Sequence, residues 1–167
     1  ISFGTDIQNF NTAGTTRMTI DADGHINIPA DSKKLKIGAS GDLEVYHDGS
    51  NSYVAEVGTG NLKLTSNGAA VDIQKGTSEY LGRFLTDGAV ELYHNDVKKF
   101  ETTATGATIT GTLTTDEISL GDSEEIKFGN SDDLKIKHNG NNSFISDSGT
   151  GALLLTTDHF KVLNPAM

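Results

Sequence analysis

Apolar and polar residues alternate over short runs of this chain. In Leu43–His47 the first, third and fifth residues fall on one side of an extended backbone, and the second and fourth fall on the other. This period of two is typical of a half-buried β-strand. Residues 61–65 and the β-branched run 108–115 alternate in the same way, with Gly111 placed for a bend. No window combines helical periodicity with helix caps, so the pattern predicts an all-β fold.

Turn residues separate these runs. Asp48-Gly49 and Asn139-Gly140 predict hairpins, because both residue types tolerate a positive φ angle. The return strands are expected to begin near Tyr53 and Phe144. Gly-Thr-Gly at 58–60 predicts a further turn. The chain is therefore expected to be a series of strand–turn–strand units.

These units repeat. Residues 35–64 return at 126–155 with a constant offset of 91, so that His47 corresponds to His138. A more divergent copy with a shorter turn surrounds His94. A period of roughly forty-five residues indicates a stacked array of supersecondary units. We therefore expect an N-terminal β segment at 1–33 and three repeats at 34–79, 80–124 and 125–167.

Composition changes this picture in one respect. Only 35% of the residues are hydrophobic, and 19 are glycine. Units this thin do not bury their apolar faces alone, which favours completion of the core by identical copies. The expected architecture is an elongated repeat fold, an intertwined homotrimeric fibre of the β-prism or β-helix-like kind. A single-chain β-solenoid is the alternative.

Net charge excludes one class of partner. A charge of −10 and no basic patch argue against nucleic-acid binding. No run approaches the length of a membrane span, and residues 1–5 do not resemble a secretory signal, so no membrane insertion is expected. The chain does not begin with Met, which indicates a fragment of a longer protein. The absence of Cys excludes disulfides and thiolate metal sites.

Three stretches resemble tail-fibre proteins of tailed bacteriophages. Residues 16–28 (TRMTIDADGHINI) resemble an element common in these fibres, whereas 90–113 (VELYHNDVKKFETTATGATITGTL) and 42–53 (DLEVYHDGSNSY) are similar to fibre repeats of marine phages, the cyanophage type. The resemblance implies a homotrimeric, β-rich fibre on the virion, outside the cell. Its expected partners are other virion tail proteins and a glycan or protein receptor on the host cell surface.

The repeated histidines are the candidate metal ligands. His47, His94 and His138 share a strand face with apolar residues, so three copies of each would converge on the axis of a trimer. Three imidazoles bind a divalent metal and leave positions open for water or an anion. The alternative is a histidine at the shoulder of a hairpin, hydrogen-bonded to backbone or water. No other cofactor is expected.

Two further motifs favour structural roles. Asp21-Ala-Asp-Gly24 looks like half of a calcium loop, but its twelfth position is Ser32 rather than a bidentate glutamate. A tight turn between strands at 18–20 and 26–28 is the simpler interpretation. The aromatic residues at the hairpins are expected to pack across strands rather than to grip glycans; they are Tyr46, Tyr53, Tyr93 and Phe144.

No motif indicates catalysis. Asp132-Asp133 and Glu124-Glu125 are adjacent, and in a strand adjacent carboxylates point to opposite faces. No nucleophile elbow or phosphate-binding loop is present. We therefore expect a structural and adhesive fibre segment, either shaft or receptor-binding region, and not an enzyme. The alternatives are a monomeric β-solenoid enzyme that degrades polysaccharide and a repeat from a bacterial surface adhesin.

Overall fold

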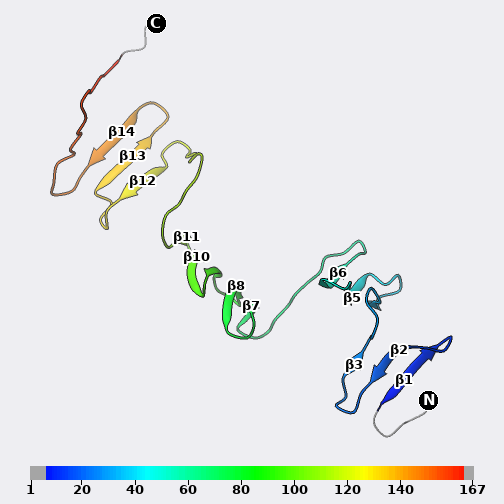
Figure 1. The fold of residues 1–167 in the computed structure, drawn as a ribbon. Helices are drawn as coiled ribbons and strands as arrows, with labels where there is room; N and C mark the ends of the chain where they lie inside the picture. Colours follow the sequence, from blue (N-terminus) through cyan, green and yellow to red (C-terminus); the bar gives the residue numbers. More distant parts are fainter. Residues whose placement is uncertain (1–6, 164–167) are drawn as a thin grey trace. The chain divides into compact units, whose positions relative to one another are not determined.

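A computed structural model describes residues 7–163. The prediction of an all-β fold is confirmed, because all fourteen regular elements of this range are strands. They form four small antiparallel sheets (Figure 1), and no sheet within this range closes on itself or forms a solenoid. None of the described residues belongs to a helix that would be long and apolar enough to cross a membrane.

The chain divides into two compact units, Ile1–Thr110 and Gly111–Met167. The first unit holds three sheets, and the second holds one. The strands of the first two sheets are β1 (Gln8–Thr12), β2 (Thr15–Ile20), β3 (Ile26–Asn27), β4 (Leu35–Ile37), β5 (Leu43–His47) and β6 (Ser52–Glu56). The third and fourth sheets contain β7 (Ala70–Lys75), β8 (Glu79–Leu85), β9 (Val90–His94), β10 (Val97–Thr103), β11 (Gly106–Ile109), β12 (Glu125–Phe128), β13 (Leu134–His138) and β14 (Ser143–Asp147).

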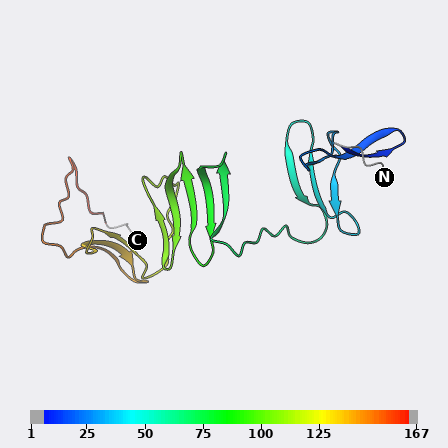
Figure 2. The same ribbon diagram turned by 90° about the horizontal axis from the view of Figure 1, so that it is seen from below.

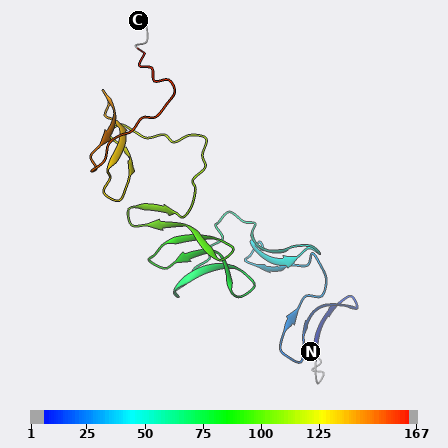
Figure 3. The ribbon, with the colours of Figure 1, turned by 60° about the vertical axis from the view of Figure 1, so that its left-hand side comes forward.

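Every sheet is a meander in which each strand pairs with the next one along the chain. Figures 2 and 3 show the five strands β7–β11 side by side in a single layer. The 91-residue offset is kept in the pairing: Leu35 aligns with Val45 and Val54 in β4–β6, and Ile126 aligns with Ile136 and Ile145 in β12–β14. The two repeats therefore have the same register, residue for residue.

The hairpin turns follow the predicted signals. Gly49 and Gly140 adopt φ angles of 99° and 91°. The residue before each glycine acts through its side chain instead: Asp48 Oδ1 accepts hydrogen bonds from two backbone N–H groups, and Asn139 Oδ1 does the same. The turn between β9 and β10 has only two residues, Asn95 and Asp96, and both have positive φ angles. This matches the shorter turn predicted for the middle copy.

The structure extends the repeat by a few residues before Leu35. Ser32 and Ser123 have φ angles of 60° and 68°, and each backbone N–H donates to the carbonyl of the repeated histidine over 2.7 Å. The shared sequence signal is Asp-Ser followed by two charged residues, at 31–34 and 122–125. Hydrophobic alternation missed it because this segment contains no apolar residue.

Some expected strands are shorter or absent. Residues 61–65 form no strand, because no neighbouring segment of the described chain pairs with them. The run 108–115 contributes only the end of β11, and the chain bends at Gly111, whose φ angle is 125°. The expected boundary at 79/80 falls where β8 begins, inside the third sheet, and the repeat boundaries stay a prediction.

The single layers leave the chain without an ordinary core. No hydrophobic residue among residues 7–163 is buried, whereas the charged residues Glu44 and Glu91 are, at 4% and 8% exposure. The apolar side chains of the described residues therefore stay at least partly open to solvent in a single chain.

Candidate functional site

Three of the sheets, β4–β6, β7–β11 and β12–β14, have two unlike faces. Because side chains alternate along a strand, the pairing registers place the apolar residues together on one side. We call this side the apolar face; it consists of Leu35, Ile37, Leu43, Val45, Val54, Val71, Ile73, Phe84, Val90, Leu92, Phe100, Ile109, Ile126, Phe128, Leu134, Ile136 and Ile145. All of these side chains are exposed or half-buried.

Two segments outside the strands lean on apolar faces. Leu62 and Leu64 line an open hollow of about 370 Å³ together with Val71, Ile73 and Phe84. In the second unit, Leu120 lines a hollow of about 490 Å³ above β12–β14, beside His138. Both hollows have apolar walls and open to solvent. The apolar faces are therefore only partly covered by the chain's own connecting segments.

The three candidate metal ligands lie on these apolar faces. The structure places His47, His94 and His138 on three different sheets. His47 Nδ1 lies 3.2 Å from Ser52 Oγ, and His138 Nδ1 lies 3.1 Å from Ser143 Oγ. In each of these two rings Nδ1 thus lies within hydrogen-bond distance of a serine hydroxyl. Metal binding by three copies stays a prediction, which elemental analysis of the assembled protein tests.

On the side of each of these sheets opposite the apolar face, which we call the charged face, ion pairs surround a glutamate side chain. In β4–β6, Lys34 Nζ lies 2.6 Å and Lys36 Nζ 3.0 Å from the carboxylate of Glu44. The hydrogen bonds from Lys34 and Lys36 lower the pKa of Glu44 below its usual value of 4.5. Beside them Tyr46 and Tyr53 stack with ring centroids 4.7 Å apart, which confirms the expected cross-strand aromatic packing for these two residues.

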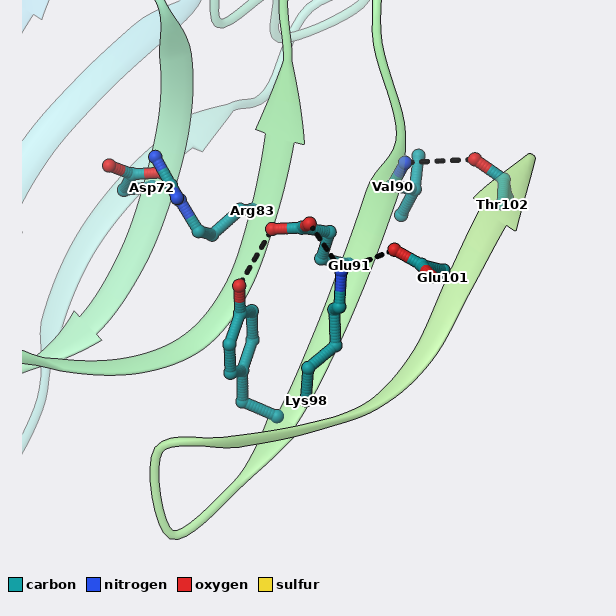
Figure 4. A network of polar contacts seen from close by, with 8 residues as sticks. Asp72, Arg83, Val90, Glu91, Lys98, Glu101 and Thr102 are labelled. Carbon is teal, nitrogen blue, oxygen red and sulfur yellow. Dashed lines mark hydrogen bonds and ion pairs between the residues drawn. The ribbon is translucent and has the colours of Figure 1, made fainter. Parts of the chain in front are cut away.

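The charged face of β7–β11 has a larger network (Figure 4). Glu91 accepts a hydrogen bond of 2.7 Å from the Tyr93 hydroxyl and one of 3.0 Å from Lys98 Nζ. Lys98 also donates to Glu101. The hydrogen bonds from Lys98 to Glu101, which has the larger effect, and to Glu91 raise the pKa of Lys98 to about 12. Hydrogen bonds from Tyr93 and Lys98 lower the pKa of Glu91. Sequence analysis missed this network, because its members are brought together only by pairing of β9 with β10.

The third network also surrounds a glutamate with lysines, but one pair of positions exchanges its charges. In β12–β14 the central carboxylate is Glu125, which pairs with Lys137 over 2.8 Å and with Lys127 and Lys135 over 3.8 Å. The 91-residue offset places Glu125 where the first repeat has Lys34 and places Lys135 where it has Glu44. The charge of both members is thus exchanged while the pair is kept. The aromatic partner changes as well: Lys137 Nζ lies 5.9 Å from the ring centroid of Phe144, where the first repeat has two tyrosines.

This exchange predicts a strong coupling between Lys34 and Glu44. Lys34→Glu places two carboxylates together, and Glu44→Lys places three ammonium groups together, so each single variant should lower the midpoint of thermal unfolding. The double variant K34E/E44K recreates the contact of Glu125 with Lys135 and should recover part of the loss, because the closer partner of Glu125, Lys137, corresponds to Tyr46 in the first repeat. Thermal unfolding of all four proteins measures the coupling. Losses that simply add would contradict it.

The acidic turn at Asp21 is a structural turn, as expected. Asp21 Oδ1 accepts hydrogen bonds from the backbone N–H groups of Asp23 and His25, at 3.1 and 2.9 Å, and its other oxygen contacts the side chains of His25 and Asn27. The hydrogen bond from the His25 backbone lowers the pKa of Asp21. Ligand atoms of Asp21, Asp23 and His25 lie within 4.8 Å of one another. The carboxylate already serves the turn between β2 and β3.

The adjacent carboxylates lie at the ends of strands, and neither pair lies wholly within one. Asp132 and Asp133 lie in the turn between β12 and β13 rather than in a strand, and Asp132 pairs with Lys127 over 2.8 Å. Glu125 is the centre of the ion network described above, and Glu124 precedes the strand.

Comparison with protein-family models, curated proteins and solved structures found no match to the chain.

Proposed function

We propose that this chain is a structural and adhesive segment of a trimeric viral tail fibre, acting as shaft or receptor-binding region outside the cell on the virion. The observation that carries the proposal is the apolar face of each sheet, which one chain leaves open to solvent. Its partners are two further copies of itself, other tail proteins and a glycan or protein on the bacterial surface.

The exposure of the apolar side chains supports assembly from identical chains. None of the hydrophobic residues in the range 7–163 is buried. Obligate oligomers bury on the order of 2,000–5,000 Å² or more and have hydrophobic interfaces. Copies that turn their apolar faces toward a common axis would bury this surface, and the charged faces would then meet solvent. The sequence resemblance to phage fibres favours three copies.

The mechanism of such a segment is mechanical. Short antiparallel sheets that share a core along an axis unfold only when many contacts break together, which makes unfolding slow. The net charge of −10 keeps separate assemblies apart by mutual repulsion. The segment would thus hold a receptor-binding tip away from the virion without chemistry of its own.

The solution mass tests the proposal directly. Light scattering on a sizing column should give about 53 kDa, three times the 17.7 kDa of one chain. The assembled protein should also resist dissociation in detergent, because the apolar faces are covered. A mass near that of one chain would contradict the proposed trimer and favour a single-chain solenoid.

A further inference from the structure

We infer that residues 61–65 and 152–156 are β-strands of the assembled protein, each pairing with a sheet edge of a second copy. This inference rests on the trimer proposed above and names the segments that intertwine the chains. In the described single chain neither segment belongs to a strand.

Both segments have the residue pattern of a strand. Leu62 and Leu64 alternate with polar residues, and the 91-residue offset places Leu153 and Leu155 at the same positions. These leucines are exposed in the single chain; Leu64 and Leu155 reach 69% and 64%. The spacing of the two leucines is kept in both repeats, with Leu154 in place of the polar Lys63. Exposed apolar residues at strand spacing with no local partner indicate a partner outside the chain.

The backbone of both segments is free to pair. None of the backbone hydrogen bonds among the described residues involves 61–65 or 152–156. Leu62 and Leu64 nevertheless line the hollow on the apolar face of β7–β8. Once copies cover that face, the N–H and C=O groups of the segment leave water, and each unpaired group then costs about 1–3 kcal/mol. A strand partner removes this cost.

β6 is a poor partner for residues 61–65 of the same chain, and β14 is a poor partner for residues 152–156. In each case the backbone continues in the direction of the strand and does not turn back along it. Val57 N–H donates to the carbonyl of Asp42 over 2.7 Å, and Ser148 N–H donates to that of Asp133 over 2.8 Å. These bonds prolong the pairing of β6 with β5, and of β14 with β13, in both repeats. Within residues 7–163 no strand pairs with the outer edges of β6 and β14, nor with the other sheet edges. The same edges on a second copy supply the missing partner.

Hydrogen exchange of the assembled protein tests the inference. Alternate amides of 61–65 and 152–156, those that face the partner edge, should exchange roughly a hundredfold or more slowly than in an unstructured peptide, as paired strands do. Lys63→Pro removes one N–H and should abolish this protection and lower the detergent resistance of the trimer, whereas Lys63→Ala keeps the N–H and should change neither.

Mixed trimers refolded from light and ¹⁵N-labelled chains identify the partner. Lysine cross-links from Lys63 should join light peptides to heavy ones. Links between peptides of the same label alone, or rapid exchange of these amides in an intact trimer, would overturn the inference and leave the proposed trimer standing. A mass of one chain would remove the trimer and the inference with it.

Discussion

Ile145→Asp is expected to convert the trimer into separate chains. Ile145 lies on the apolar face of β12–β14 and is 60% exposed in the single chain, so the single chain alone gives little reason for an effect. In the assembly three copies lose the burial of an isoleucine, which is worth about 1.5–3 kcal/mol each, or roughly 5–9 kcal/mol per trimer. Three carboxylates would also lose water without a partner.

The neighbouring residue provides the control. Ser146 lies on the charged face, opposite Lys135, so Ser146→Asp adds the same charge beside an ammonium group and should leave the mass unchanged. Light scattering and thermal unfolding of both variants measure the difference. If both variants stay trimeric with equal stability, the apolar face of β12–β14 is not an interface.

Acid is expected to destabilise the assembly below about pH 4.5. Hydrogen bonds hold the pKa of Glu44, Glu91 and Glu125 below its usual value of 4.5. The donors are lysines for Glu44 and Glu125, and Tyr93 with Lys98 for Glu91. A carboxylate whose folded pKa is lowered contributes stability that is present above its unfolded pKa and is lost as the pH falls through the folded pKa. Each such group occurs three times in a trimer.

A second electrostatic effect acts in the opposite direction at milder pH. The net charge of −10 shrinks as the pH approaches the pI of about 4.7, which weakens repulsion between copies. The midpoint of thermal unfolding should therefore change little from pH 7 to about 5 and fall steeply below about pH 4.5. Glu91→Gln should lower this midpoint at pH 7 and flatten its dependence on acid. A midpoint that stays constant down to pH 3 would contradict a role for the three networks.

Local signals of the chain were sufficient for much of the secondary structure. The alternation in Leu43–His47 predicted β5, and the Asn-Gly pair at 139–140 predicted the hairpin between β13 and β14. Both depend on neighbours in the sequence, namely side-chain period and turn φ angles. The strand expected at 61–65 does not form in the described single chain. The alternation of apolar and polar residues indicates which face each side chain would take, but it does not supply a partner strand.

The candidate site was predictable only in part. The repeat placed His47 and His138 on the same face as the apolar residues, and the pairing registers agree. Their serine partners, Ser52 and Ser143, were not expected, because they depend on the register of the hairpin. The glutamate networks were missed for the same reason: Glu91 and Lys98 are seven residues apart and meet only across a turn.

The sequence by itself determined the strand class, the turns, the repeat and the alternation that separates apolar from charged residues, since all of these are local properties of an extended backbone. The tertiary structure decided that the apolar residues of each of the sheets β4–β6, β7–β11 and β12–β14 share one open face and that ion pairs surround a glutamate on the opposite face. Register is the physical reason: it depends on which residues pair across strands, and a shift of one residue would exchange the two faces.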